Sequence, residues 1–334
     1  MKSRMNGVRR RHLAIACIAS MGDSFAVPAR AGKPARVGFL VSDRAGDPRG
    51  PEAFRQGLRN LGYLEDRDVL IEFRSAEGNF ARLAELATEL VARQVDVIVA
   101  SNTPAALAAK QATTLIPIVF VGAGDPITSG LVTTLARPGG NVTGLSVLST
   151  ELVGKWLELL GQTVPRVSRV AILWQPGAMD DRTERAMFAG AEAAARSLGL
   201  TIQFVAARGP SDLERSFADM RREHADALAI RPAPMFLNER GRLVDLAATN
   251  RLPAVYAWRE FAEAGGLLAY GPNLADLNER AAGYVEKILR GAKPSELPVE
   301  QPAKFDLVVN IKAARAIGIT IPQAVLVRAD SIIQ

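Results

Sequence analysis

The chain of 334 residues has a single cysteine, Cys17, and only two histidines, His12 and His224. One cysteine excludes an intrachain disulfide framework and a metal site built from several cysteines. Two histidines leave little material for a zinc site or a histidine-based catalytic triad. We expect His224, which follows a charged run near the end of a helix, to lie on the surface. The sequence therefore predicts neither a metal nor any other cofactor.

Long apolar runs are also scarce, and none beyond the first residues reaches the roughly 18 apolar residues of a membrane span. The N-terminus itself combines a cationic stretch, "MKSRMNGVRRRH", with the nine-residue apolar core "LAIACIASM" and the cleavage motif Ala29-Arg30-Ala31. This pattern predicts a secretory signal peptide over residues 1–31 and a soluble mature protein. A disordered basic tail is the alternative, and Cys17 leaves lipidation open.

The positive charge does not indicate a nucleic-acid partner. The formal net charge is +6, but part of the excess lies in the first 36 residues. Elsewhere arginine and glutamate alternate along the faces of expected helices, and we find no helix-turn-helix, zinc-finger or RNP-type motif. The charge therefore predicts a solvated basic surface.

The chain contains an internal repeat of strands that alternate with helices. "RVGFLV" at residue 36 returns as "RVAILW" at residue 169, 133 residues later, and "VDVIVA" returns as "ADALAI". Alternating strands and helices predict parallel sheets covered on both faces. The expected strands lie at 36–41, 69–73, 95–100 and 117–121 in the first half and at 169–174, 198–205, 225–230 and 252–257 in the second. The fold class is therefore α/β, with two similar doubly wound lobes.

A third segment follows the two halves. It contains the apolar run 265–270, an amphipathic helix from Leu274 to Ile288 and another apolar run at 305–310. These pieces are too small for a third domain, so we expect them to cross back and complete the two sheets, which makes a multi-crossing hinge. The expected first lobe is 36–146 with about 265–296, and the second is 147–264 with about 297–334.

The loop "VGAGDPITSGL" at residues 121–131 resembles a phosphate-binding loop but lacks its defining residues. Ile127 stands where a dinucleotide fingerprint needs its third glycine, and the preceding strand is the fourth of its half. A Walker sequence is absent as well. Ligands of open parallel sheets bind beyond the carboxyl ends of strands, so the loops at these ends are either plain turns or the walls of a ligand cleft.

The strand end at residues 101–103 offers the first candidates for ligand binding. We expect Thr103 to cap the helix that follows, to join Ser101 and Asn102 in holding a carboxylate at the helix N-terminus, or to do both. Asp125, after the fourth strand, either caps a helix that begins at Ile127 or faces a ligand amine.

The other candidates stand at or near further strand ends. The aromatic residues there are either core residues or a stacking surface for a ligand. Glu260 pairs with either a ligand ammonium or the neighbouring Arg259. The candidates are Ser42, Asp43, Trp174, Tyr256, Glu260 and Tyr270, with Trp258 as a further aromatic residue at a strand end.

Three long stretches carry a resemblance to a known family: "IPIVFVGAGDPITSGLVTTLARPGGNVTGLS" (116–146), "EAGGLLAYGPN" (263–273) and "ILRGAKPSELPVEQPAKFDLVVNIKAARAIGITIP" (288–322). The chain resembles the substrate-binding proteins of ABC transporters, of the TrpX-like tryptophan/tyrosine-binding type with the type I periplasmic-binding-protein fold. The resemblance implies a monomeric periplasmic receptor for an amino acid or another small carboxylate. It also implies an ABC permease and ATPase as partners.

The resemblance implies that the protein is not an enzyme, and we find no activated nucleophile or acid/base pair that would argue otherwise. The alternative is a periplasmic sensor or amidase-like regulator that uses the same fold. A transcription repressor of similar fold would need an N-terminal DNA-binding domain, and only about 35 residues precede the first expected strand.

Overall fold

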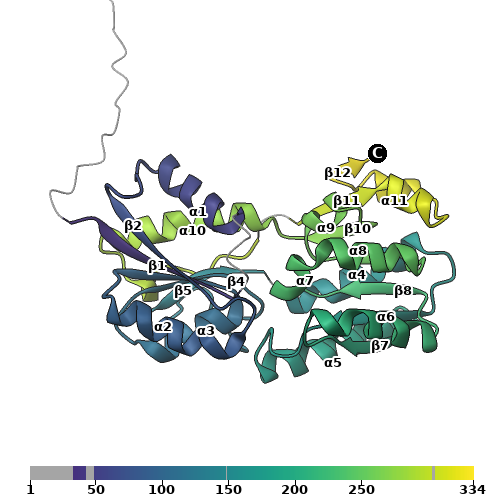
Figure 1. Ribbon diagram of the computed structural model, residues 1–334, viewed down its shortest axis with the longest axis horizontal. Coiled ribbons are helices and arrows are strands. Elements are labelled where there is room, and N and C mark those ends of the chain that lie inside the picture. Colours follow the sequence, from purple (N-terminus) through teal and green to yellow (C-terminus); the bar gives the residue numbers. More distant parts are fainter. Residues whose placement is uncertain (1–32, 43–48, 148, 303–304) are drawn as a thin grey trace, which may run out of the picture. The chain divides into compact units, whose positions relative to one another are not determined.

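The computed structural model describes residues 33–42, 49–147, 149–302 and 305–334 (Figure 1). The expected signal peptide and Asp43 lie outside these residues. Residues Lys33–Gln334 form one compact unit, which contains a five-stranded and a seven-stranded sheet. Helices alternate with the strands, which confirms the predicted α/β fold with two doubly wound sheets.

The first sheet is entirely parallel, with the strand order β2-β1-β3-β4-β5. Its strands are β1 (Ala35–Val41), β2 (Val69–Ser75), β3 (Val97–Ser101), β4 (Ile118–Ala123) and β5 (Val142–Ser146). The segments around it are α1 (Arg49–Asn60), η1 (Phe80–Arg82), α2 (Leu83–Ala92), α3 (Asn102–Ala112), α10 (Leu274–Leu289) and η3 (Pro294–Glu296).

Apolar side chains on both faces of the first sheet explain its two helical layers. Phe39 packs with Phe54 of α1 and Val285 of α10 on one face, whereas Leu40 packs with Leu90 of α2 on the other. α1 and α10 accordingly lie together on one side, with α2 and α3 opposite (Figure 1). Gly57 permits the close contact of the first pair, because a Cβ there would lie 2.4 Å from the Glu279 carbonyl oxygen.

The second sheet has the order β12-β11-β10-β9-β8-β6-β7, with β10 and β11 antiparallel. Its strands are β6 (Arg169–Trp174), β7 (Thr201–Ala206), β8 (Ala227–Ile230), β9 (Ala254–Tyr256), β10 (Leu268–Gly271), β11 (Asp306–Asn310) and β12 (Ser331–Ile333). Its helical segments are α4 (Ser149–Thr163), α5 (Asp181–Ser197), η2 (Pro210–Asp212), α6 (Leu213–Arg222), α7 (Pro234–Asn238), α8 (Arg240–Thr249), α9 (Arg259–Glu263), α11 (Ile311–Ala316) and α12 (Gln323–Leu326).

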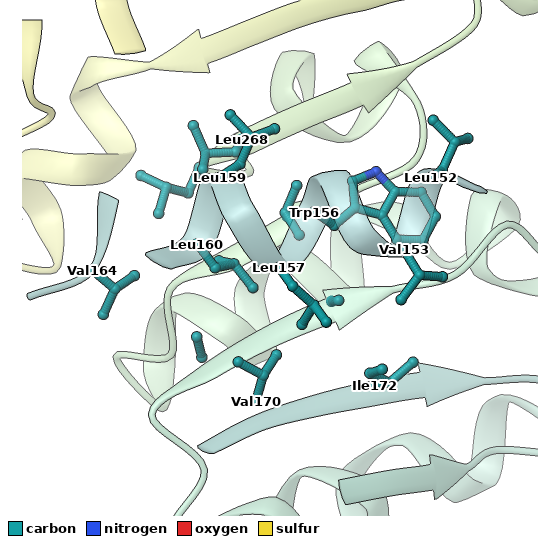
Figure 2. Packing of buried hydrophobic residues seen from close by; sticks show 14 of the residues in the cluster. Leu152, Val153, Trp156, Leu157, Leu159, Leu160, Val164, Val170, Ile172 and Leu268 are labelled. Carbon is teal, nitrogen blue, oxygen red and sulfur yellow. The ribbon is translucent and has the colours of Figure 1, made fainter. Parts of the chain in front are cut away.

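Trp156 of α4 lies at the centre of one core layer of the second sheet. It is fully buried and belongs to the same apolar cluster as Ile172 of β6 and Leu268 of β10, part of which Figure 2 shows. Its indole Nε1 donates a hydrogen bond to the carbonyl oxygen of Tyr270 at 2.7 Å. A buried indole N–H needs such a partner, so this bond fixes α4 against the end of β10.

The predicted repeat is present in the strand order, because β2-β1-β3-β4 in the first sheet corresponds to β7-β6-β8-β9 in the second. Equivalent aspartates support both copies. Asp96 accepts the backbone N–H of Arg36 at 2.7 Å, and Asp226 accepts that of Arg169 at 2.8 Å. In each copy a carboxylate before the third strand therefore holds the start of the first.

Three strand assignments differ from the expectation. β5 forms at the end of the expected first lobe, where no strand was expected, and β12 was not expected either. The run 265–270, which we expected with the first lobe, contributes β10 to the second sheet, where Leu268 is paired with Val255 of β9. These strands are short and take their place from pairing partners distant in sequence. The lobe boundaries as a whole stay a prediction.

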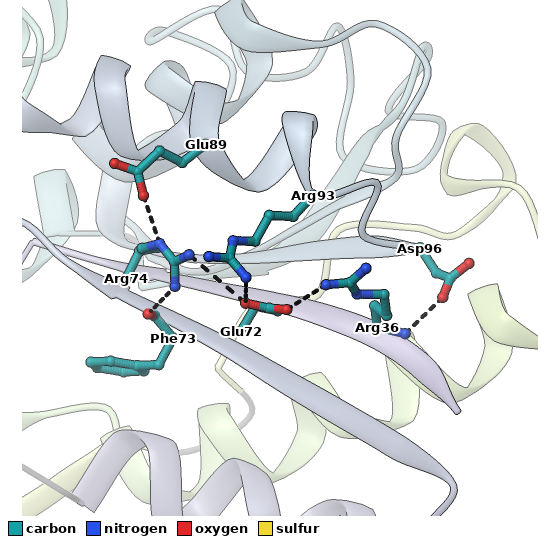
Figure 3. Close-up of polar contacts among 7 residues, drawn as sticks. All are labelled: Arg36, Glu72, Phe73, Arg74, Glu89, Arg93 and Asp96. Carbon is teal, nitrogen blue, oxygen red and sulfur yellow. Dashed lines mark hydrogen bonds and ion pairs between the residues drawn. The ribbon is translucent and has the colours of Figure 1, made fainter. Parts of the chain in front are cut away.

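The edge strand β2 carries an ion network that Figure 3 shows. Glu72 accepts a hydrogen bond from Arg36 Nη2 at 2.6 Å and lies 3.4 Å from Arg93 and 3.8 Å from Arg74. The bond from Arg36 is the main reason why the pKa of Glu72 lies below its usual value. Charged side chains on an edge strand oppose pairing with another sheet, which is their simplest role here.

Candidate functional site

A cavity of about 570 Å³ is the best-formed candidate site. Such a volume suits a small molecule, and a mostly apolar wall with a few polar groups is typical of ligand pockets. The wall includes Phe39 and Phe73 of the first sheet together with Met179, Leu237 and Trp258 from the part of the chain that forms the second. Polar groups reach it from the starts of α1, α3 and α9.

The three predicted residues at the start of α3 all line this cavity. Asn102 has a positive φ of 62°, a conformation that asparagine tolerates better than most residues. Its Oδ1 accepts the N–H of Ala105 at 3.2 Å and the hydroxyl of Ser42 at 3.1 Å. Asn102 therefore caps α3, and the alternative in which Thr103 is the cap is wrong. Ser42 is fully buried and lies behind Asn102.

The hydroxyls of Ser101 and Thr103 differ in how they are satisfied. Thr103 is only 2% exposed, and its Oγ1 accepts the N–H of Gly124 at 3.2 Å. No group among the described residues lies within hydrogen-bonding distance of the buried Ser101 Oγ. A buried hydroxyl normally has a partner, so Ser101 is suited to bond a ligand or a water molecule in the cavity.

The glycine-rich loop after β4 has divided roles. Gly122, with φ of 81°, and Gly124 both line the cavity. Asp125 Oδ1 instead accepts the backbone N–H groups of Ile127 at 3.1 Å and Thr128 at 2.9 Å. These bonds close a turn, whereas we expected either a helix cap or a ligand contact. The predicted helix from Ile127 is wrong, because 125–130 is a turn and bend.

Three of the predicted aromatic residues do not line this cavity. Trp174 packs edge-on against Phe188, with ring centroids 4.9 Å apart. Tyr256 is 1% exposed and stacks on Phe261 at 4.6 Å, and burial raises its pKa. Tyr270 stacks on a further phenylalanine at 5.8 Å. Tyr256 is therefore a core residue, whereas Trp174 and Tyr270 are half-buried and pack against other aromatic rings.

Trp258 is the aromatic strand-end residue that lines the cavity, together with Glu260. The Glu260 side chain is 12% exposed, and its Oε1 lies 3.9 Å from Arg49 Nη1. The expected alternative partner, Arg259, pairs with Glu263 at 2.9 Å instead. Arg49 was missed from the sequence. The signal that could have found it is its place at the start of a helix that follows the end of β1.

A second arginine, Arg231, lies next to the cavity wall and was also missed. It is 4% exposed, and its Nη2 donates a hydrogen bond to Met179 Sδ at 3.2 Å. Burial lowers its pKa to about 10, and the charge of Glu184 opposes this shift. The detectable signal was a charged residue directly after the fully buried strand β8.

The described residues form neither a membrane-spanning helix nor a cluster of metal ligands. No helix in the described part of the chain is both long and apolar enough to span a bilayer. Within the same residues, no three histidine, cysteine, aspartate or glutamate side chains are grouped to hold a metal ion.

Comparisons with known proteins agree with the geometry. The model of a family described as "ABC transporter substrate binding protein" matches residues 48–333. A curated tyrosine-binding protein of Clostridioides difficile is 22% identical over 80% of this chain and 75% of its own length.

Two solved structures are similar along nearly the whole chain. A conserved domain protein from Vibrio cholerae is 30% identical with a TM-score of 0.82, covering 90% of this chain and 100% of its own. An ABC domain from Streptococcus pneumoniae in complex with L-Trp is 27% identical with a TM-score of 0.81, over the same shares of the two chains.

Proposed function

Since this chain belongs to the family of ABC transporter substrate-binding proteins, we propose that it is the extracytoplasmic receptor of an ABC importer. It captures a small amino-acid-like carboxylate in the cavity of about 570 Å³ and presents it to permease and ATPase subunits. The proposal includes export by the N-terminal signal peptide and release of a monomeric mature protein. The family and the similar proteins are binding proteins, so no covalent chemistry is assigned to the cavity.

The observation that carries the proposal is that aromatic side chains and a few polar groups line the same cavity. Phe39, Phe73 and Trp258 supply faces for an apolar or aromatic side chain. Such stacking contributes about 0.5–1.5 kcal/mol beyond the area buried. The relatives whose names state a ligand, L-Trp and tyrosine, support an aromatic amino acid.

The polar residues of the cavity lining suit the carboxylate and the ammonium group of an amino acid. The hydroxyls of Ser101 and Thr103, with Asn102 at the start of α3, are placed to receive the carboxylate. The Glu260 carboxylate, already beside Arg49, is placed to receive an ammonium group. A zwitterion with an aromatic side chain therefore fits this cavity better than a neutral sugar.

The test is to measure binding to the mature chain after unfolding and refolding have removed any co-purified ligand. Isothermal titration calorimetry with L-tryptophan, L-tyrosine and benzoate, with D-xylose as a neutral control, should show binding of at least one aromatic carboxylate. Mass spectrometry of the ligand released on unfolding provides an independent identification. Binding of D-xylose alone, or release of a ligand without a carboxylate, would contradict the proposal.

A further inference from the structure

Arg231 is a buried cation with an unusual set of partners. It follows β8, is 4% exposed, and within the described residues its side chain donates a hydrogen bond only to the thioether sulfur of Met179. No carboxylate among the described residues lies within 4 Å of its guanidinium, and its Nε has no hydrogen-bond partner there. A buried charge without a paired charge is strongly unfavourable. The arrangement therefore calls for a reason other than stability.

The surroundings of Arg231 contain polar atoms that are also unsatisfied. Gln175 follows β6, the neighbour of β8, and its Oε1 is buried without a partner in the described structure. Thr183 Oγ1 and Asp180 Oδ2, at the start of α5, are in the same condition. Glu184 is the charged group that acts on Arg231, and its pKa is raised mainly by burial. Because this single carboxylate lies more than 4 Å away, it compensates only part of the positive charge of the Arg231 guanidinium.

The other cations of the cavity are already matched with acids. Arg59 bonds Glu52 at 2.6 Å, and Arg49 lies 3.9 Å from Glu260. An incoming carboxylate would have to compete with these acids for either arginine. Arg231 is the neighbouring cation for which no such competitor stands within 4 Å in the described residues.

Met179 separates Arg231 from the cavity, because it lines the cavity and accepts the bond from the guanidinium. A thioether is a weak acceptor, and the unbranched methionine side chain has three rotatable bonds. A carboxylate is a much stronger partner for a guanidinium, since the hydrogen bond is charge-assisted and bidentate contact is available. A ligand carboxylate could therefore take the place of the Met179 sulfur as partner of the guanidinium if the flexible Met179 side chain moved away.

We propose that Arg231 supplies the charge that binds the ligand's carboxylate, and that Met179 is the movable cover that occupies the guanidinium when no ligand is bound. This inference rests on the proposed function and assigns a residue to its ligand specificity. The neutral hydroxyls of Ser101 and Thr103 orient the carboxylate, whereas Arg231 distinguishes it from an uncharged group.

A purely structural Arg231 would behave differently from a carboxylate receptor. If internal water joined it to Gln175 and Thr183 as part of the core, its removal would lower stability and weaken all ligands equally. If it is held for a ligand, replacing it by an apolar residue of similar length should leave the stability of the ligand-free protein unchanged or higher. The same replacement should affect only ligands that carry a carboxylate.

The experiment compares L-tryptophan and L-tyrosine with their neutral amides, L-tryptophanamide and L-tyrosinamide, by calorimetry on the refolded full mature chain. In Arg231→Met we expect affinity for the acid to fall roughly 10- to 100-fold, the loss expected for a hydrogen bond to a charged group. The affinity of Arg231→Met for the amide should stay within about threefold of the affinity of the unsubstituted protein, because the amide has no carboxylate that Arg231 could bind. Arg231→Lys should keep part of the preference for the acid, and Met179→Leu should keep it in full.

Thermal unfolding of the ligand-free variants completes the test. A melting temperature of Arg231→Met equal to or above that of the unsubstituted protein supports the proposal. Equal losses of acid and amide binding together with a lower melting temperature would assign Arg231 to the core and overturn it. Unchanged acid binding in Arg231→Met would overturn it while the proposed function stands. Failure of the unsubstituted protein to bind any of the four ligands would reject the aromatic amino acid and this inference together.

Discussion

The hydroxyl of Thr103 accepts a hydrogen bond from the backbone N–H of Gly124 at 3.2 Å. This bond connects the start of α3 with the loop after β4, and both partners line the cavity. In Thr103→Val the shape is kept and the acceptor is lost. We expect the free energy of unfolding to fall by about 1–3 kcal/mol, because the buried N–H of Gly124 loses its partner.

The same variant tests where the carboxylate lies. If Thr103 also donates to the ligand, its affinity should fall roughly tenfold or more, the equivalent of about 1.4 kcal/mol. Thr103→Ser keeps the hydroxyl and is the matched control, with a small change in both quantities. Urea unfolding and calorimetry separate the two effects. A stability loss without an affinity loss would mean that the carboxylate does not bind at the start of α3.

A second prediction concerns which tryptophan reports the ligand. Trp258 lines the cavity, whereas Trp174 packs on Phe188 and Trp156 is fully buried. A non-tryptophan ligand such as L-tyrosine should change the tryptophan fluorescence through Trp258. We expect Trp258→Phe to abolish this change and weaken binding about twofold to tenfold, since part of the stacking surface remains.

The matched control is Trp174→Phe, which should keep both the fluorescence response and the affinity. A response that survives in Trp258→Phe and disappears in Trp174→Phe would move the ligand away from the proposed wall.

The third prediction concerns acid stability and Asp226. Burial alone would raise the pKa of this carboxyl, but hydrogen bonds from the N–H groups of Arg169 and Ser168 and from the Ser168 hydroxyl outweigh it. The pKa is therefore lowered on folding. A lowered pKa stabilises the fold above the unfolded value of about 3.9, and this contribution is lost as the pH falls through the folded pKa.

Asp226→Asn should accordingly be less stable than the unsubstituted protein at neutral pH, by about 0.5–1.5 kcal/mol because the carboxylate is exposed to solvent, and the difference should shrink as the pH falls below the unfolded value of about 3.9. Urea unfolding at several pH values measures it. The exposed Asp245→Asn on α8 is the control and should show no such pH dependence. A difference that is constant between neutral and acid pH would contradict this assignment of the stabilising charge.

Much of the fold follows from local patterns in the sequence. The inner strands of the repeat are apolar runs buried on both faces, and "VDVIVA" and "ADALAI" show this with their aspartates in place. The polar residues Ser101 to Thr103 were found because the carboxyl end of a parallel strand is a defined place in this architecture. Both inferences need only the spacing of apolar residues along the chain and the order of the strands and helices.

Which of the candidate residues line the cavity and which are buried depends on packing that cannot be read from the sequence. Tyr256 and Trp258 are two residues apart and equally apolar, yet contact with Phe261 buries the first in the core, and the second lines the cavity. Arg231 looks like an ordinary loop cation until its burial is known. The sequence suggested Thr103 instead of Asn102 as the cap because both residue types suit that role. The hydrogen bonds decide between them, since Asn102 Oδ1 accepts the N–H of Ala105 whereas Thr103 Oγ1 accepts that of Gly124.

A fourth prediction concerns export. Residues 1–31 combine a cationic start, an apolar core and Ala29-Arg30-Ala31. We expect the mature N-terminus near Gly32, which is one residue before the compact unit Lys33–Gln334 begins. N-terminal sequencing of protein from the periplasmic fraction checks this. An intact Met1 on protein recovered from the cytosol would contradict it.

The last prediction concerns motion. After β5 of the first sheet the chain forms β6 to β10 of the second, returns in α10 to pack on the first, and then enters β11 of the second. Three crossings between two separately packed cores predict a hinge, in which short connecting segments absorb the change and the cores stay rigid. We expect the ligand to close the cavity and to reduce the radius of gyration in small-angle X-ray scattering.

The control for this measurement is a protein that folds but binds poorly. Arg231→Met, examined with L-tryptophan or L-tyrosine at a concentration that saturates only the unsubstituted protein, should show no reduction. Closure is driven by the ligand's higher affinity for the closed state than for the open state. The reduction in the radius of gyration should therefore increase in proportion to the fraction of protein with bound ligand during a titration. A ligand that binds by calorimetry and leaves the scattering curve unchanged would show that the cavity accepts it without hinge closure.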